Sequence, residues 1–232
     1  MIQQQMNILD ILSDEKKYVR RITAMDAIPF LLNVHYARRI PCITDAFGLF
    51  VDGRLIGVVT YGIPASNNLC FGLAGKENVD KVKELNRLVI IPEFNGKNYA
   101  SYLVSHSLRM LENGTFVVSY ADTAWSHVGY VYQACNFLYT GLSAQRTDVM
   151  VADGKHPRHT EGLDKNFRQT RSRKHRYVYL VGDKRTKKRM RQQLKYEVIN
   201  KYPKGDEVHY DPDSPKAVNP ITYYEREEEN NE

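Results

Sequence analysis

The stretch from residue 83 to residue 141 constrains the fold more than any other part of this sequence. Residues 83–91 end in an apolar, β-branched run that a proline stops, which predicts a buried strand. An amphipathic helix is predicted over 99–111, because leucines recur there near helical spacing and Asn-Gly follows. A second strand over 115–121 and a short helix over 126–135, capped by its first serine, complete the unit. Two strands joined by a helix pair in parallel, so we expect a site at their carboxyl ends.

The chain before this unit predicts a strand at 18–23, a helix at 25–35 and a β-hairpin. Asp52-Gly53 separates the apolar segments 47–51 and 55–61, and this dipeptide is a strong signal for a turn of two or three residues. Antiparallel strands are therefore added to the parallel pair. The predicted fold class is α/β (α+β), with a mixed central sheet flanked by helices.

The remaining elements are predicted from shorter signals. Residues 64–75 are expected to form a loop, and 137–147 a returning strand with Gly141 at a turn or bulge. A strand-like run at 176–181 precedes a basic helix at 184–195.

The distribution of charge points to nucleic acid. The chain carries a formal net charge of +6, but residues 155–191 hold 14 Lys and Arg against three acids, a local charge of +11 that leaves −5 elsewhere. Cations this concentrated repel one another unless a polyanion neutralises them. We therefore predict double-stranded DNA as a partner, although a solvated surface is the simpler alternative. The predicted DNA-binding residues are Arg38, Arg39, Arg168, Arg171, Arg173, Lys174, Arg176, Lys184, Arg185, Lys187, Lys188, Arg189 and Arg191.

The sequence favours a soluble, cytoplasmic protein. It has no apolar run of membrane-spanning length, and its first residues lack the pattern of a signal peptide. Cys42, Cys70 and Cys135 are odd in number and far apart, which favours reduced and mostly buried thiols over structural zinc.

Several segments resemble known families. Residues 88–103 resemble the cofactor loop of the GNAT acyltransferase fold, and residues 131–137 resemble a later motif of that fold, in which a tyrosine lies five residues before an aromatic. More narrowly, segments 84–88, 119–122 and 127–132 are similar to the Mom-type bacteriophage proteins, which modify adenine in DNA.

The resemblance to the Mom-type proteins covers roughly residues 18–200. It implies a GNAT-fold transferase. It would convert adenine N6 in double-stranded DNA to N6-carbamoylmethyl-adenine in the infected host cell and so protect phage DNA from restriction. A small-molecule group donor is implied. Because Asn98 stands where the family's loop has its first glycine, an acyl-CoA donor is disfavoured, although amides at a helix start can hold phosphate. The implied cofactor-binding residues are Asn95, Gly96, Lys97, Asn98 and Ala100.

Four ranges describe the expected domain organisation. Residues 1–17 form an N-terminal arm and 18–150 the GNAT-like catalytic domain. Residues 151–204 form a basic DNA-binding extension packed on it, which begins with a polar loop too long for an ordinary connection. Residues 205–232 form an acidic tail that is expected to be disordered.

The predicted site centres on Asp122, which ends the second parallel strand. Its carboxylate would take a proton from the adenine amine, and the alternative is that it only caps the next helix. Tyr132 lies in the motif where the GNAT fold often keeps a general acid, and a buried structural phenol is its alternative. His35 and Tyr36, at the end of the first helix, complete the predicted catalytic set. Aromatic residues beside Asp122 could stack on a flipped base or simply pack in the core. The predicted substrate-binding residues are Ser119, Tyr120, Trp125, His127 and Glu84.

Three questions stay open at this point. His35, His127, Glu84 and Asp122 are residue types that bind iron or zinc, but no close ligand pair supports a metal site. The chain is compatible with a homodimer. Two other functions fit the pattern, namely an acyl-CoA N-acetyltransferase of a small amine or protein, and a non-catalytic nucleic-acid-binding protein with the GNAT fold.

Overall fold

The computed structural model of this protein describes residues 16–149, 167–205 and 221–223. These residues form two compact units. Unit 1 contains the described residues up to 118 together with 179–195, and unit 2 contains the other described residues. The predicted division after residue 150 lies outside the described residues, as do most of the arm, the polar loop and the acidic tail.

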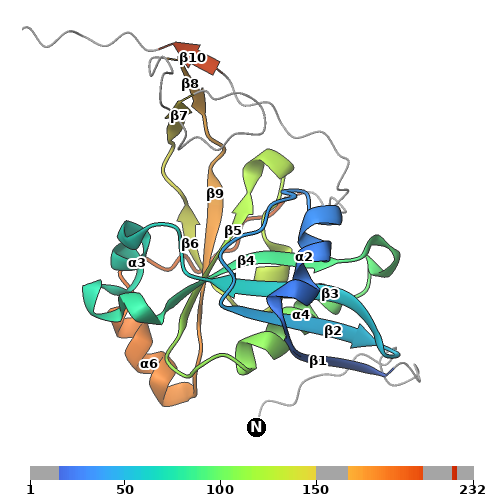
Figure 1. Ribbon diagram of the computed structural model, residues 1–232. Helices are drawn as coiled ribbons and strands as arrows, with labels where there is room; N and C mark the ends of the chain where they lie inside the picture. Colours follow the sequence, from blue (N-terminus) through green and yellow to red (C-terminus); the bar gives the residue numbers. More distant parts are fainter. Residues whose placement is uncertain (1–15, 150–166, 206–220, 224–232) are drawn as a thin grey trace, which may run out of the picture. The chain divides into compact units, whose positions relative to one another are not determined.

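Unit 1 is a mixed sheet with helices packed on it (Figure 1). Neighbouring strands are antiparallel, except that β4 and β5 are parallel, so the predicted mixed α/β class and the parallel pair are confirmed. In spatial order the strands are β1 (Lys17–Ile22), β2 (Asp45–Val51), β3 (Arg54–Gly62), β4 (Val82–Ile90) and the first half of β5 (Phe116–Asp122). The helices are α2 (Ala24–Asn33), α3 (Asn67–Ala74), η1 (Lys76–Lys81), η2 (Pro92–Phe94), α4 (Tyr99–Arg109) and α6 (Lys184–Gln193).

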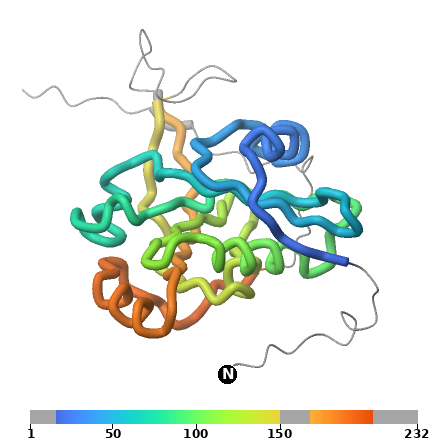
Figure 2. Tube along the Cα trace, turned by 60° about the horizontal axis from the view of Figure 1, so that its bottom comes forward, coloured from blue at the N-terminus to red at the C-terminus, as the bar shows by residue number. Residues whose placement is uncertain are grey.

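Helices α2 and α4 pack on opposite faces of this sheet. Leu31 of α2 packs in one apolar cluster with Val58 of β3. The Tyr61 hydroxyl of the same strand shares a hydrogen bond of 2.6 Å with Ser107 of α4. Side chains alternate along a strand, so positions 58 and 61 face opposite sides. Figure 2 shows the two helices, α2 in blue and α4 in green, on either side of the strands.

The β-hairpin predicted around Asp52-Gly53 is confirmed, with β2 and β3 as its strands. Asp52 and Gly53 have φ values of 46° and 83°, the left-handed pair that a type I′ turn requires. At the start of β2, Asp45 forms ion pairs of 2.5 Å with both Arg21 and Lys83, which tie β1, β2 and β4 together.

The predicted loop over 64–75 is wrong in part, because α3 occupies residues 67–74. Cys70, Leu73 and Ala74 are buried on one side of this short helix. Burial of that face stabilises a helix that its two asparagines and one glycine make poor by intrinsic propensity.

Strand β4 carries a bulge that matters for the site. Arg87 pairs with Thr60 and Leu85 pairs with Tyr61, so Asn86 is an extra residue without a partner on β3. A bulge of this kind changes the direction of neighbouring side chains. The parallel ladder between β4 and β5 is short and ends with the pair Glu84 and Val118.

Unit 2 is built around β6 (Leu138–Leu142) and the first part of β9 (Lys174–Leu180), which pair in antiparallel fashion. Gly141, with φ of 86°, lies where the register of this pair shifts, so the predicted turn or bulge is confirmed. The other elements are η3 (Thr123–Trp125), α5 (Tyr130–Ala134) and a small antiparallel sheet of β7 (Thr147–Val149), β8 (Phe167–Thr170) and β10 (Ile221–Tyr223).

The predicted helix over 126–135 is wrong at its start. Asp122 caps the turn η3, and Ser126, with φ of 54°, ends that turn instead of capping the next helix. Helix α5 begins only at Tyr130, after Gly129 in the left-handed conformation. A Cβ at position 129 would lie 2.5 Å from the Tyr177 ring, so the residue before α5 must be glycine.

Candidate functional site

The Asp122 carboxylate makes two kinds of contact in unit 2. Its Oδ1 accepts the backbone N–H of Ala124 at 3.0 Å, which is the cap of η3. Its Oδ2 lies 3.2 Å from the Nζ of Lys174, a residue that the sequence pointed to only as a DNA contact. Burial raises the pKa of Asp122, but a hydrogen bond from Ser172 and the charge of Lys174 outweigh it, and the net pKa lies below its ordinary value. Asp122 is therefore an ionised carboxylate, and the cap and the ion pair coexist.

His127 lies close enough to Asp122 for the two charges to interact. Burial lowers the pKa of His127, and the Asp122 charge raises it by less, so the imidazole is neutral near pH 7. Trp125, Tyr120 and His127 are half-buried, which leaves part of each side chain accessible. Ser119 is fully buried and packs inside the unit.

Tyr132 belongs to an aromatic cluster of unit 2. Its ring centroid lies 5.4 Å from those of both Phe137 and Tyr177. The Tyr177 hydroxyl donates to the Val128 carbonyl oxygen, and burial raises the pKa of Tyr177 well above its ordinary value. Tyr132 itself is half-buried, so it sits at the edge of this cluster.

His35 and Tyr36 lie in unit 1, directly after α2. The imidazole of His35 is buried, and its Nδ1 accepts the backbone N–H of Ala37 at 3.0 Å. In the neutral ring the proton therefore resides on Nε2. The Tyr36 ring stacks on the imidazole with centroids 4.3 Å apart. Of the predicted catalytic residues, unit 1 thus holds His35 and Tyr36, and unit 2 holds Asp122 and Tyr132.

The bulge residue Asn86 anchors the loop that follows His35. Its Nδ2 donates to the Cys42 carbonyl oxygen at 2.8 Å, and its Oδ1 accepts from the Thr60 hydroxyl at 2.6 Å. Gly62 leaves room for this contact, since a Cβ there would lie 1.9 Å from the Cys42 oxygen. The loop that carries Tyr36, Arg38 and Arg39 is thereby held to the sheet.

Glu84 and Arg87 of β4 lie on the same sheet face as Thr60, the face that α2 covers. Electrostatic interactions with Tyr36 and Glu84 raise the pKa of Arg87, and the charge of Arg39 lowers it, so all three lie near the guanidinium. The fold therefore brings together two predicted residues from the loop, one predicted substrate-binding acid and an arginine that the sequence analysis missed. Its place in the segment resembling the Mom-type proteins was the only available signal.

The predicted cofactor loop lies at the N-terminus of α4, in unit 1. Asn95, Gly96, Lys97 and Asn98 are exposed, and Ala100 is half-buried. Asn98 is the N-cap, but its side chain makes no capping hydrogen bond. The start of this 11-residue helix is therefore open to solvent, as an anion site at a helix N-terminus requires.

The predicted DNA-binding residues fall into two classes. Those on β8, β9 and the turn between them bond protein atoms. Arg168 binds Thr147, Arg171 pairs with Asp148, Arg173 binds the Ser143 oxygen, Lys174 pairs with Asp122, and Arg176 binds Thr140.

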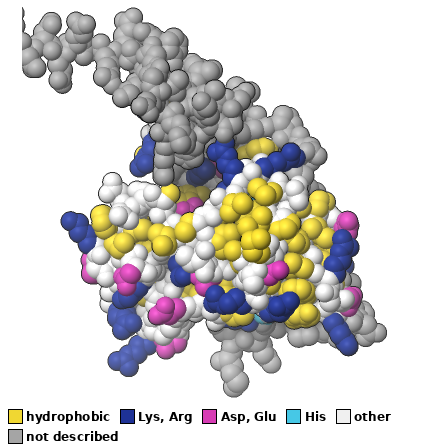
Figure 3. Space-filling model, viewed as in Figure 1, with side chains coloured by type: hydrophobic (Ala, Val, Ile, Leu, Met, Phe, Trp, Pro, Cys, Tyr) yellow, Lys and Arg dark blue, Asp and Glu magenta, His cyan; other side chains and the backbone are white. Residues whose placement is uncertain are grey.

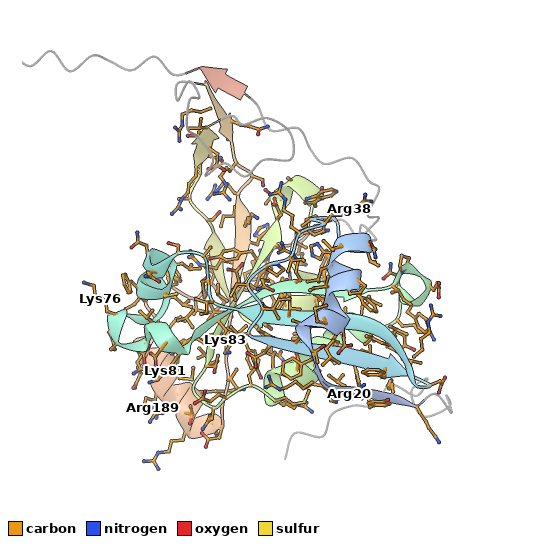
Figure 4. The ribbon with its side chains drawn as sticks, viewed as in Figure 1. Arg20, Arg38, Lys76, Lys81, Lys83 and Arg189 are labelled. Atoms are coloured by element: carbon orange, nitrogen blue, oxygen red, sulfur yellow. The ribbon has the colours of Figure 1, made fainter. Side chains whose placement is uncertain are left out.

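Those on α6 mostly project into solvent. Thr186 and Met190 face the interior of unit 1, and Lys187 bonds the Tyr179 hydroxyl at 3.1 Å. Dark-blue side chains stand at the lower left of Figure 3, and Figure 4 labels Arg189 there together with Lys76 and Lys81 of η1. The exposed cations of α6 are Lys184, Arg185, Lys188, Arg189 and Arg191. Arg38 and Arg39, on the loop after α2, are also exposed.

Within the described ranges, no group of three or more His, Cys, Asp or Glu side chains is placed to hold a metal ion. The three cysteines are free, with Cys42 exposed and the other two buried. Among the described helices, none has both the length and the apolar character needed to cross a membrane.

Comparisons with known proteins match one protein family and a number of solved structures. The family model described as the Mom protein family matches residues 16–204. No curated protein matches the sequence. Among solved structures, the chain is similar to an N-acetyltransferase from Staphylococcus aureus (14% identity, TM-score 0.44, covering 72% of this chain and 99% of that one). It is also similar to the NAA60 of Arabidopsis thaliana in complex with acetyl-CoA (14% identity, TM-score 0.45, covering 72% and 99%).

Proposed function

Since this chain belongs to the Mom protein family, whose model matches residues 16–204, we propose that it is a transferase that modifies adenine in double-stranded DNA. The product would be N6-carbamoylmethyl-adenine, which protects phage DNA from restriction inside an infected host cell. Family membership over most of the chain is the observation that carries this proposal. The exposed cations of α6 and the ionised carboxylate of Asp122 supply parts that such a reaction needs.

Asp122 would hold the adenine amine. The N6 lone pair is conjugated with the ring, so attack by this nitrogen leaves positive charge on it that an acceptor must relieve. Because the pKa of Asp122 is lowered, its carboxylate is a weak base and a persistent anion. Its main contribution would be to orient the amine and stabilise the developing charge, and to take the proton once the new bond raises the acidity of N6.

Other predicted residues would act around this acceptor. Trp125 and Tyr120, both half-buried and within a few residues of Asp122, are suited to stack on a base removed from the duplex. Tyr132, at the edge of its aromatic cluster, would supply a hydroxyl as general acid. His35 and Tyr36, on the loop after α2 in unit 1, are also proposed to take part in catalysis.

DNA would be held mainly by α6. Its exposed cations lie on one helix, and Lys76 and Lys81 of η1 extend the same side of unit 1 (Figure 4). Contacts of this kind bind phosphates without reading sequence. The open start of α4 would receive an anionic part of the group donor, and because Asn98 replaces a glycine of the GNAT loop, acetyl-CoA should bind weakly or not at all.

The test is mass spectrometry of nucleosides from plasmid DNA co-expressed with this protein. A heavier deoxyadenosine that is absent with the empty vector supports the proposal. If all four deoxynucleosides keep their masses while an amine substrate becomes acetylated, the chain is an acetyltransferase and the proposal fails.

A further inference from the structure

Arg87 is a half-buried cation that has no carboxylate partner among the described residues. Its Nη1 donates to the carbonyl oxygen of the adjacent Asn86 at 2.6 Å. Its Nε is buried and has no hydrogen-bond partner, the only side-chain nitrogen or oxygen of which this holds in the part of the chain that the structure describes. The edge of the guanidinium formed by Nε and Nη2 thus contains a buried N–H that no described atom accepts.

Two other half-buried arginines show what this edge does when its role is structural. Arg168 donates from Nε and Nη2 to the hydroxyl and carbonyl oxygens of Thr147, at 2.7 and 3.0 Å. Arg176 does the same with Thr140, at 2.9 Å for both bonds. In both cases a protein oxygen accepts the Nε–H, the group that is left without an acceptor in Arg87.

The surroundings of Arg87 raise the free-energy cost of its unsatisfied N–H. Burial lowers the pKa of Arg87, and the neighbouring Arg39 lowers it further, whereas Tyr36 and Glu84 raise it. A guanidinium stays charged at any physiological pH, so the fold keeps a cation in a partly dry site beside a second cation.

The position of Arg87 is fixed by its neighbours. It follows the bulge at Asn86, whose side chain is bonded to both Thr60 and Cys42. The same bonds hold the loop that brings Tyr36 and Arg39 near. A fork of donors in a fixed position, with one buried N–H unsatisfied and an exposed arginine nearby, is the arrangement that carboxylate and phosphate ligands require.

We infer that the Nε and Nη2 edge of Arg87, assisted by Arg39, binds an oxyanion, either a carboxylate or a phosphate group. The proposed function offers two sources for it, a phosphodiester of the DNA backbone or an anionic group of the donor. Only this choice of source rests on the proposed function, because the unsatisfied edge is a property of unit 1 alone.

The first test is thermal unfolding of the full chain in an anion-poor buffer, with inorganic phosphate or acetate then added. We expect the wild type to be stabilised by at least one of these anions, since a ligand that binds only the folded state raises the unfolding temperature. Arg87→Met should lose this response and should unfold at the same or a higher temperature without anion, because an uncompensated buried charge is removed. Arg109→Met, which changes an exposed arginine of α4, should respond like the wild type.

A structural role for Arg87 gives the opposite pattern. The wild type would then ignore both anions, and Arg87→Met would unfold at a clearly lower temperature. Should Arg87→Met fail to fold, the titration of the wild type together with Arg87→Lys still decides, because lysine keeps the charge but not the fork and should weaken the response.

DNA binding separates the two sources. If the oxyanion is a backbone phosphate, Arg87→Met should weaken binding to every duplex and lower the slope of log K against log salt by about one. If it belongs to the donor, the slope should equal that of the wild type while the response to small anions is lost. Neither measurement requires a modified base, so a failure of the proposed chemistry would leave this inference standing.

Discussion

Asp122→Asn separates the two contacts of Asp122, because its two oxygens have different partners. The amide oxygen of asparagine can still accept the Ala124 N–H, and asparagine caps nearly as well as aspartate. The amide cannot take a proton and carries no charge to stabilise an amine cation. If Asp122 is the acceptor for adenine N6, the modification rate should fall on the order of a hundredfold or more.

The cost in stability should be small by comparison, and it arises mainly from the ion pair with Lys174, because the asparagine amide oxygen can still accept hydrogen bonds of the kind that Ser172 and Ala124 donate. A hydrogen bond between charged groups contributes on the order of 1.5–3 kcal/mol. The Lys174 side chain is 37% exposed, so water replaces part of what is lost. We expect the free energy of unfolding to fall by about 1 kcal/mol, which lowers the Tm of a chain of this size by about 2–4 °C. A loss of this size leaves the protein folded.

The assay compares modified deoxyadenosine per unit of soluble protein, together with Tm and DNA affinity, for the wild type and the variant. Asp183→Asn is the matched control, because Asp183 caps α6 through the Thr186 N–H and belongs to no predicted site. It should modify DNA at the wild-type rate. If Asp122→Asn modifies DNA at the wild-type rate, the carboxylate serves only as a cap and the catalytic assignment is refuted.

Lys174→Met extends the same test to pH. Lys174 helps to hold the pKa of Asp122 down, so its loss should raise that pKa. The ionised fraction of Asp122 then falls at a higher pH, and the acid limb of the rate profile should move upward. An unmoved acid limb in a folded variant would mean that the ionisation of Asp122 does not limit the reaction.

Three further predictions concern unit 1. Replacing Arg185, Lys188 and Arg189 with glutamine should weaken DNA binding regardless of DNA sequence. In a fluorescence anisotropy titration, the slope of log K against log salt should fall by up to about three. An unchanged slope would mean that α6 does not contact DNA. Asp45→Asn should flatten the loss of stability on acidification, followed by circular dichroism. Burial raises the pKa of Asp45, but its lysine and arginine partners lower it more, so the net pKa in the folded protein is lowered. The stabilisation from Asp45 is therefore fully present above the pKa of the unfolded state and is lost as the pH falls through the pKa of the folded state. Gly62→Ala should destabilise by about 1–3 kcal/mol in urea unfolding, because its Cβ would collide with a backbone oxygen, and wild-type stability would refute the packing described for the loop.

The sequence predicted the elements whose signals are local. The Asp52-Gly53 turn needs two residues with positive φ, and few residue pairs tolerate that conformation. Helix α4 was predicted within two residues, because its apolar spacing and the Asn-Gly that follows act within a single helix. The turn and the helix could be predicted because each signal and its effect lie within a few residues, and the parallel pair of β4 and β5 was predicted from the helix that connects the two strands.

The remainder depends on contacts between distant residues. Helix α3 exists because Cys70 and Leu73 are buried by other parts of unit 1, and its own sequence reads as a loop. The bulge at Asn86 is invisible in sequence, since it is defined by the register against β3. The pairing of Lys174 with Asp122 joins residues 52 positions apart, and no periodicity predicts such a contact.

The basic stretch illustrates why a count of charges was insufficient. Residues 168–176 and 184–191 look alike in composition, but the first group lies on strands and the turn between them, where backbone and hydroxyl oxygens are within reach of each guanidinium. The second group lies on a helix whose own carbonyls are already bonded, so its cations project into solvent, except Lys187, which bonds the Tyr179 hydroxyl. Cations that the protein has already satisfied must give up those bonds to meet phosphate, whereas the exposed cations of α6 give up only water. Phosphate binding should therefore depend on α6 first, and the arginines of β8 and β9 should matter chiefly for the stability of unit 2.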